Sequence, residues 1–374
     1  MRIYFGVSGV GRGHAMRSGR LAKELIIKGH EIFVSSYGDG LEAIKRVGLS
    51  ENVCEVTPYE YVWHDKGLDW SLTIVKSIFK SKKFLNHFID ELSCISKTSP
   101  DFVVSDSRVS TLIASKILRI PVSLITNQLS IFHVSWFLRR LISIGFSSIW
   151  NLSDKILVTD LPPPYTISYV NIVPYMERYD EKIHFVGLLD DLSKYVEIVN
   201  KDERDIDVTF IISAPRSDRL RFGRSIIKLV KLLSKKGLRI VVLGEDMFHY
   251  KSNNVSFLGW VEDPLVFIRN SRSVFVRGGQ TSILEAIMAS TPLLVSPAPR
   301  QTEQEGNAVS VKRNNIGELV PYDVLVDDPE YAARTVFKFL ENLDPYYDEV
   351  QKARHMGFKI GGIRKAIEIL LKMD

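Results

Sequence analysis

Short apolar runs alternate with stretches of helical periodicity along almost the whole chain of 374 residues. The first apolar run is Arg2 to Ser8, and a helical stretch follows it from about Arg17 to Lys28. This alternation recurs up to Thr159 and begins again at Asp207. Strands that alternate with helices form parallel sheets covered by helices, so the pattern predicts an α/β fold with two parallel-sheet domains in tandem.

The breaks in this pattern divide the chain into segments. Residues 1–180 are expected to form a Rossmann-like domain and residues 181–345 a second one, with the two facing each other across a cleft. Residues 346–374 are expected to be helical. Gly361-Gly362 interrupts this tail and allows the last helix to turn back toward the first domain.

Composition excludes several classes of protein. The chain has 49 basic and 44 acidic residues, and a net charge of +5 over this length does not predict a nucleic-acid partner. Cys54 and Cys94 are the only cysteines, so neither a disulfide framework nor a Cys-rich zinc site is expected. No signal peptide is visible at the N-terminus. These features favour a reducing, cytoplasmic setting.

A glycine-rich loop follows the first strand and reads Gly9-Val10-Gly11-Arg12-Gly13-His14. His14 stands where a dinucleotide-binding G-x-G-x-x-G pattern has its last glycine, and the second strand ends without a ribose-binding acid, so a nicotinamide enzyme is disfavoured. A histidine in such a loop suits a general base, because its side chain titrates near neutral pH. A helix cap or an exposed loop residue is the alternative.

Asp106 directly follows the apolar strand Asp101 to Ser105. In a doubly wound sheet the first and fourth strands are neighbours, so Asp106 is expected to reach His14 and fix its tautomer. An Asx turn or a cap is the alternative interpretation of Asp106. Arg17 and Arg108 are candidates for contact with the acceptor or a phosphate, and Arg17 has the alternative of pairing with an acid.

The segment Val274 to Glu285 runs from a strand through Gly278-Gly279 into a helix. Free N–H groups at such a helix start bind phosphate, and Thr281 or Ser282 either caps the helix or donates to the same anion. Glu285, one turn in, suits the two hydroxyls of a ribose, although an acid there also simply favours the helix dipole.

Three motifs together resemble the GT-B glycosyltransferases, nearest the group of MurG-type N-acetylglucosaminyltransferases and UDP-glycosyltransferases. They are Gly11-x-Gly13-His14, Gly278-Gly279-x-x-Ser282-x-x-Glu285 and Gln304-Glu305-x-Asn307-Ala308. The resemblance implies an acceptor site in the first domain, a nucleotide-sugar site in the second, and an inverting reaction without metal or cofactor. It also implies that His14 is the base, Asp106 its partner and Glu285 the ribose ligand, and that Gln304 and Glu305 contact the donor sugar.

The chain departs from this family in one loop. Ser213-Ala214-Pro215-Arg216-Ser217 replaces the family's glycine-serine loop, so Arg216 is expected to supply charge there.

Phe257 to Val261 resembles the segment whose backbone reads the base, which favours uridine. Asp205-Ile206-Asp207 is interpreted as a solvated turn and not as a metal-binding Asp-x-Asp. The expected nucleotide-sugar contacts are Gly11, Gly13, Ser213, Arg216, Trp260, Val261, Arg277, Gly278, Gly279, Thr281, Ser282, Glu285, Gln304 and Glu305.

Residues 130–150 are apolar and aromatic but contain Arg139-Arg140, which suits an interfacial helix better than a spanning one. They predict a glycan or lipid-linked acceptor and peripheral contact with the inner face of the cell membrane, with a core helix as the alternative. Three other functions stay open: a nucleotide-sugar hydrolase of the same fold, a non-catalytic nucleotide-sugar-binding subunit, and a UDP-sugar 2-epimerase.

Overall fold

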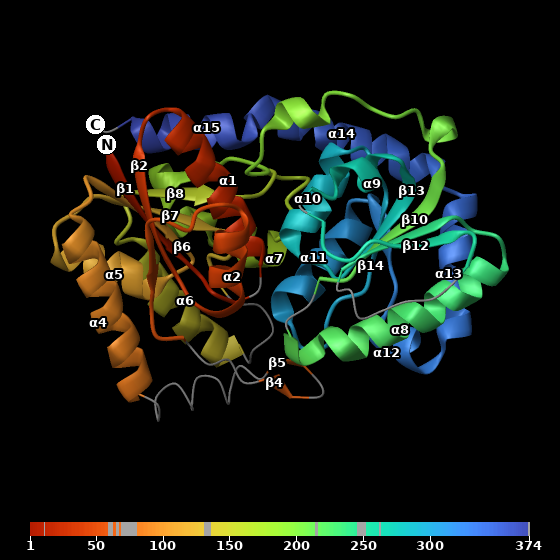
Figure 1. The fold of residues 1–374 in the computed structure, drawn as a ribbon, viewed down its shortest axis with the longest axis horizontal. Coiled ribbons are helices and arrows are strands. Elements are labelled where there is room, and N and C mark those ends of the chain that lie inside the picture. Colours follow the sequence, from red (N-terminus) through yellow and green to blue (C-terminus); the bar gives the residue numbers. More distant parts are fainter. Residues whose placement is uncertain are drawn as a thin grey trace.

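The computed structural model describes residues 1–10, 12–58, 63–64, 67–68, 81–130, 136–213, 216–244, 252–261 and 263–372. Two parallel sheets lie side by side, each packed between helices, and the predicted α/β fold class is confirmed (Figure 1). The two domains meet along the carboxyl ends of their strands, where the sequence places its polar motifs.

The first sheet has seven strands in the order β3-β2-β1-β6-β7-β8-β9. Its strands, all parallel, are Arg2–Val7 (β1), Glu31–Ser36 (β2), Val53–Glu55 (β3), Phe102–Asp106 (β6), Val122–Thr126 (β7), Lys155–Val158 (β8) and Ile183–Phe185 (β9). A separate antiparallel pair joins Trp63–His64 (β4) and Gly67–Leu68 (β5). Because β1 and β6 are neighbours, Val7 pairs with Asp106 and the residues that follow the two strands emerge together.

The helices around this sheet are Gly13–Ile27 (α1), Gly38–Arg46 (α2), Ser81–Thr98 (α4), Val109–Ile117 (α5), Trp136–Trp150 (α6) and Tyr169–Ile172 (α7). Short 3-10 turns cover Val173–Arg178, Asp180–Lys182, Leu192–Tyr195 and Lys201–Glu203. The helix α1 begins four residues before the predicted start at Arg17, so His14 lies in its first turn and not in the loop.

The second sheet has six parallel strands in the order β12-β11-β10-β13-β14-β15. They are Ile206–Ile211 (β10), Ile240–Leu243 (β11), Val255–Phe257 (β12), Ser271–Val276 (β13), Leu293–Val295 (β14) and Gly317–Leu319 (β15). The helices are Arg216–Lys235 (α8), Leu265–Arg269 (α9), Gln280–Met288 (α10), Thr302–Arg313 (α11), Tyr322–Asp327 (α12) and Pro329–Glu341 (α13).

The chain crosses between the domains twice. After the second sheet, Asp344–Ile360 (α14) leads to Gly361, whose φ of 102° is a conformation that favours glycine and lets the chain turn. The final helix Gly362–Leu371 (α15) then packs its apolar face into the core of the first domain beside β1 (Figure 1). The strand β9 also belongs to the first sheet, so this sheet extends beyond the division drawn at residue 180.

Two local expectations need correction. Cys54, in β3, and Cys94, in α4, form a disulfide that joins elements 40 residues apart, because α4 crosses the sheet beside β3. Asp207 does not lie in a solvated turn but within β10, where it is mostly buried and accepts from the Arg239 backbone and the Arg272 side chain.

Candidate active site

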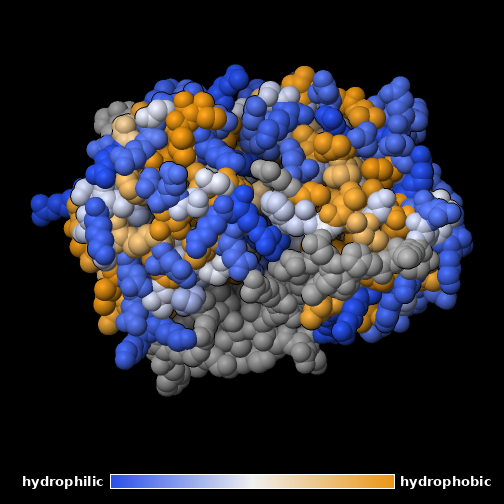
Figure 2. Space-filling view, in the orientation of Figure 1, coloured by the Kyte–Doolittle hydropathy of each residue, from blue (hydrophilic) through white to orange (hydrophobic). Residues whose placement is uncertain are grey.

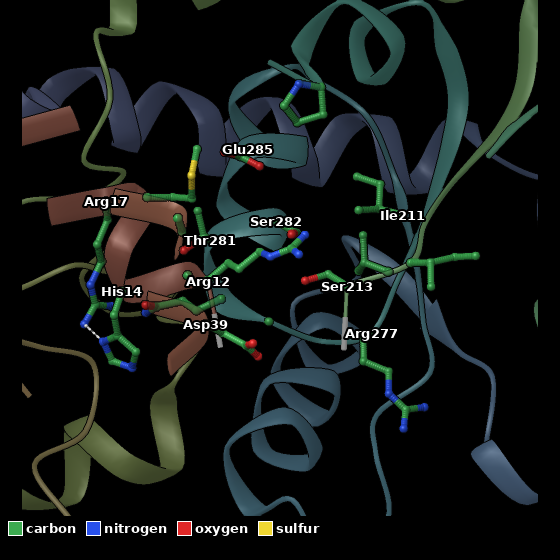
Figure 3. A pocket seen from close by; sticks show the side chains of 18 of the residues that line it. Arg12, His14, Arg17, Asp39, Ile211, Ser213, Arg277, Thr281, Ser282 and Glu285 are labelled. Carbon is green, nitrogen blue, oxygen red and sulfur yellow. Dashed lines mark hydrogen bonds between the residues drawn. The ribbon is translucent and has the colours of Figure 1, made fainter. Parts of the chain in front are cut away.

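A cavity of about 330 Å³ lies between the two domains. First-domain side chains from α1, including His14 and Arg17, line one side (Figure 3). Ser213, Thr281 and Ser282 of the second domain line the other side (Figure 3). Ligands of parallel sheets bind beyond the carboxyl ends of the strands, and both sheets meet this cavity at that edge.

The loop before His14 is held by close backbone packing. A Cβ on Gly9 would lie 2.1 Å from the carbonyl oxygen of Tyr37, so only glycine allows the loop after β1 to pack against the residue that precedes α2. A Cβ on Gly13 would lie 3.8 Å from Oγ1 of Thr281 in the second domain. The start of α1 therefore approaches the start of α10 across the cavity.

His14 and Asp106 are in contact, with 2.8 Å between Nδ1 of the histidine and Oδ1 of the carboxylate. Arg17 Nη2 lies 2.9 Å from the same nitrogen and donates to the same carboxylate oxygen. We assign the ring proton to Nδ1, because Oδ1 of Asp106 then accepts from both His14 and Arg17 and no lone pair of the ring faces the carboxylate. The Nε2 atom is then an acceptor. About a quarter of the His14 side chain is exposed (24%), whereas the Asp106 side chain is fully buried (0%), so the histidine alone of the two can meet a substrate.

Arg17 and Ser18 fix the Asp106 carboxylate from the same helix. The Arg17 Nε atom donates to Oδ2 over 2.9 Å and the Ser18 hydroxyl donates to the same oxygen over 2.7 Å. Burial tends to raise the pKa of Asp106, but the charges of Arg17 and His14 outweigh it and hold this pKa well below its ordinary value. Arg17 is itself buried, so it pairs with an acid, which was the alternative to a phosphate contact.

A buried hydrogen-bond chain runs from Arg17 into the second domain. Arg17 Nη1 donates to the Thr159 hydroxyl over 3.1 Å, and this hydroxyl donates to Oε1 of Gln280, at the start of α10, over 3.3 Å. Gln280 Nε2 in turn donates to Asp160 over 2.6 Å. Burial raises the pKa of Asp160 to about 6, although the N–H groups of Ile167 and Ser168 and the Gln280 amide oppose this. These hydrogen bonds tie the His14 site to α10, the helix that follows the glycine turn Gly278-Gly279.

The glycine turn presents an open helix start. Gly278 has φ +96°, and a Cβ there would lie 3.2 Å from the Gln304 carbonyl oxygen. Gly279 is the N-cap of α10 and makes no side-chain cap bond, and a Cβ on it would meet nothing within 4 Å. Asn307 Nδ2 donates to the Gly278 carbonyl over 3.0 Å and holds the turn in place. The first N–H groups of α10 therefore face space that an anion can fill.

Glu285 lines the cavity one turn further along α10. Its side chain is mostly buried and accepts from Nη2 of Arg20, on α1, over 2.8 Å. Burial raises the pKa of Glu285, and the Arg20 charge opposes this shift. The carboxylate thus stands at the contact between the two domains.

Comparisons with known proteins agree with this architecture. Residues 1–141 match the glycosyl transferase family 1. An uncharacterized glycosyltransferase of Methanosarcina mazei is 28% identical over 386 residues, covering 100% of this chain and 98% of the relative. The spinosyn rhamnosyltransferase SpnG complexed with thymidine diphosphate superposes with a TM-score of 0.71 at 15% identity, covering 99% of this chain and 100% of SpnG. The chain therefore has the GT-B fold, and it resembles glycosyltransferases over its whole length.

SpnG has also been solved with the spinosyn aglycone, and that structure superposes with a TM-score of 0.69 at 14% identity, covering 99% of this chain and 100% of SpnG. The match in fold therefore extends over both domains of the chain. The expected resemblance to GT-B enzymes is confirmed, and sugar transfer is the activity that the family and the relatives support.

Several of the predicted site residues do line the cavity. They are Gly13, His14, Arg17, Ser213, Trp260, Val261, Arg277, Gly279, Thr281, Ser282, Glu285 and Gln304. Thr281 and Ser282 do not cap α10, since the helix has no side-chain cap bond. Gly11 and the Arg216 side chain lie outside the described residues.

Arg108 corrects a prediction, because it does not line the cavity. Its side chain is buried beneath β1 and donates to Glu91 over 2.6 Å and to the Ser35 hydroxyl over 2.8 Å. His87 lies against the same guanidinium at 3.0 Å, and burial lowers the pKa of this histidine to about 4. The buried carboxylate of Glu91 explains why the arginine turns inward.

Arg277 and Glu305 of the second domain were also predicted to contact the donor, but their side chains make other contacts. The Arg277 guanidinium lies between the rings of Phe222 and Tyr322, 4.2 and 4.5 Å from their centroids, and points away from His14 (Figure 3). Glu305 is not among the lining residues, because its carboxylate turns back to accept from the Arg300 backbone over 2.8 Å.

Glu303, which the sequence motif did not single out, lines the cavity in place of Glu305. Its carboxylate accepts from Asn127 Nδ2 across the domain contact over 2.7 Å. Asn127 follows the carboxyl end of β7, so the rule that selected Asp106 after β6 would also have selected it. Arg46 of α2 was missed as well, and its guanidinium lies 5.5 Å from the ring centroid of Trp260 across the cleft. No motif or spacing in the sequence indicates that Arg46 and Trp260 are in contact.

Proposed function

We propose that this protein is a glycosyltransferase that moves a sugar from a nucleoside diphosphate sugar to an acceptor hydroxyl in a single displacement that inverts the anomeric centre. One observation carries the proposal: the His14–Asp106 pair faces the glycine turn and the open start of α10 across a single cavity. A base and an anion site on opposite sides are what such a displacement requires, because the nucleophile attacks the anomeric carbon from the face opposite to the one that the leaving group departs from.

In this mechanism Nε2 of His14 takes the proton of the acceptor hydroxyl while its oxygen forms a bond to the anomeric carbon. The bond between that carbon and the diphosphate oxygen breaks, and the electron pair leaves with the nucleoside diphosphate. Asp106 stabilises the imidazolium that forms. The N–H groups at the start of α10, with the hydroxyls of Thr281 and Ser282, stabilise the charge that develops on the diphosphate.

For the donor, we propose that Glu285 binds the ribose hydroxyls and that the backbone around Trp260 and Val261 reads the base. All three residues line the cavity. Glu303 and Gln304 are then the residues available to the sugar hydroxyls, in place of the predicted pair Gln304 and Glu305. Uridine is the base we propose on the resemblance of Phe257 to Val261 to a uridine-reading segment, and the thymidine diphosphate bound to SpnG makes thymidine the competitor to test.

The donor assignment predicts ligand-dependent thermal stabilisation. UDP-sugars at 100 times their dissociation constant should add about 2.7 kcal/mol to the free energy of unfolding, and TDP-, GDP- and ADP-sugars should add less. The shift with UDP-sugars should disappear in Glu285→Ala. The matched control is Glu318→Ala in the same domain, which removes a glutamate that pairs with Lys312 at the surface. This variant should keep the stabilisation by UDP-sugars. A panel without any shift, or a shift that survives in Glu285→Ala, would contradict the assignment.

For the acceptor, we propose a glycan or lipid-linked alcohol reached through peripheral contact with the inner face of the cell membrane. Leu141 and Ile144 of α6 are each 51% exposed, next to the exposed Arg140. The helix α4 exposes Leu85 and Ile89, and hydrophobic side chains reach the surface over it at the left edge of Figure 2. Exposed apolar residues beside basic ones suit an anionic lipid surface. Among the helices in the described ranges, none is long and apolar enough to span a membrane.

This contact predicts binding to vesicles that contain anionic lipid. Replacing Leu141 and Ile144 together with serine should reduce the bound fraction in vesicle sedimentation, and added salt should reduce it further. Ile27→Ser removes a residue that is 76% exposed on α1 and is the matched control. Equal sedimentation of the double variant and the parent would contradict the proposed membrane contact, and it would not bear on the proposed sugar transfer.

A further inference from the structure

Arg20 is a buried arginine at the domain contact that the proposed chemistry does not use. It lies on α1, and its side chain is only 15% exposed. Its Nη2 atom is 2.8 Å from Oε1 of Glu285, which lies 265 residues away in the second domain. Its Nη1 atom is 3.3 Å from Oδ2 of Asp190, in the segment that connects the two domains. One guanidinium therefore joins three parts of the chain.

The same helix carries the base. His14 lies in the first turn of α1, Arg17 holds Asp106 one turn later, and Arg20 reaches Glu285 one turn after that. An α-helix rises 1.5 Å per residue and is stiff over this length. The position of Glu285 is therefore tied, through a single rigid element, to the position of His14.

We propose that Arg20 is a positioning residue for the donor: it aims the Glu285 carboxylate at the ribose and aligns the bound donor with His14. The proposal rests on the proposed role of Glu285 as the ribose ligand. The ion pair uses Oε1, and a carboxylate can accept about four hydrogen bonds over its two oxygens, so Oε2 remains able to accept from ribose hydroxyls while Arg20 stays in place.

The surroundings of Glu285 explain why it needs this partner. Burial raises the pKa of Glu285, and the charges of Asp190 and Asp263 raise it further, whereas Arg20 lowers it. The Tyr195 hydroxyl also belongs to this group and donates to Asp190 over 3.2 Å. Without Arg20, the buried carboxylate would take up a proton at a higher pH, and a protonated carboxyl is a poorer acceptor for ribose hydroxyls.

The test measures donor kinetics of Arg20→Met and Arg20→Lys against pH. The hydrogen bonds from the ribose hydroxyls to the Glu285 carboxylate would weaken, so KM for the UDP-sugar should rise about 10- to 100-fold in Arg20→Met, with a much smaller change in kcat. The acidic limb of kcat/KM for the donor should move to higher pH. Arg20→Lys keeps the charge and should return the limb toward the parent. Arg269→Met, at an exposed ion pair with Glu197, should change neither quantity.

Asp190→Asn supplies an independent check if Arg20→Met does not fold. Because the Asp190 charge raises the pKa of Glu285, its removal should move the acidic limb to lower pH, opposite to the arginine variant. A merely structural Arg20 would lower stability without moving the acidic limb of kcat/KM. An unchanged limb in Arg20→Met, or in Asp190→Asn where Arg20→Met does not fold, would overturn the proposal. Unchanged UDP affinity in Glu285→Gln would instead refute the ribose role itself, which separates failure of this inference from failure of the proposed function.

Discussion

His14→Ala is expected to lower kcat by about 100- to 10,000-fold, the usual contribution of a general base. The acceptor hydroxyl would have to lose its proton to water, because no other group in the described part of the cavity combines an exposed imidazole nitrogen with a buried carboxylate partner. The rate is measured as release of nucleoside diphosphate from the donor, with an acceptor or with water as the nucleophile.

The affinity for UDP shows whether His14→Ala slows the chemical step alone or also disrupts the donor site. Asp106 keeps Arg17 and Ser18 when the imidazole is removed, so the fold and the second domain should be unaffected. UDP should bind His14→Ala within about twofold of the parent, because a group used only in the transition state does not change ground-state binding. Full activity of His14→Ala at neutral pH would exclude this histidine as the base.

Asp106→Asn is expected to lower both activity and stability. Arg17 is buried and would lose its counter-charge, and breaking a buried ion pair from one side costs about 3–5 kcal/mol. The amide also cannot fix the His14 tautomer as a carboxylate does. Chemical denaturation measures the first effect and product release the second. Asp101→Asn changes an exposed acid at the opposite, amino end of β6. Its amide oxygen can still accept from the Arg2 N–H, so the change should cost about 0.5 kcal/mol or less.

The stability that Asp106 contributes depends on pH, because folding lowers the pKa of its carboxyl group. The pKa of Asp106 is lower in the folded protein than in the unfolded chain, so its contribution is fully present above the ordinary value of 3.8. It is lost as the pH falls below that value toward the depressed pKa. Acid should therefore destabilise the parent more than Asp106→Asn, and parallel acid transitions of the two proteins would contradict the pairing.

The fold and the contact of His14 with Asp106 could be predicted because they depend on local periodicity and on one rule of topology. The alternation of strands and helices sets the two sheets, and the neighbouring positions of β1 and β6 bring His14 to Asp106 although 92 residues separate them. The glycine turn before α10 could be predicted for a similar reason, since its sequence directly encodes a strand, a turn and a helix start.

The contacts between the domains could not be predicted in this way. Arg20 and Glu285 meet only because two sheets dock at a particular angle, and no periodicity records that angle. The same holds for Asn127 and Glu303. Arg108 shows the opposite error, because a basic residue after a strand suggested a ligand contact while a buried glutamate, Glu91, turned its side chain inward.

The anomeric configuration of the product tests the central claim most directly. Proton NMR can follow the first turnovers of an α-linked UDP-sugar, with an acceptor or with water as the nucleophile. The single displacement proposed for His14 predicts that the new bond is β from the first spectrum onward, and that this signal is lost in His14→Ala. An α product at the earliest time would contradict the account, because it requires retention at the anomeric carbon and a chemistry that one base facing one leaving group does not supply.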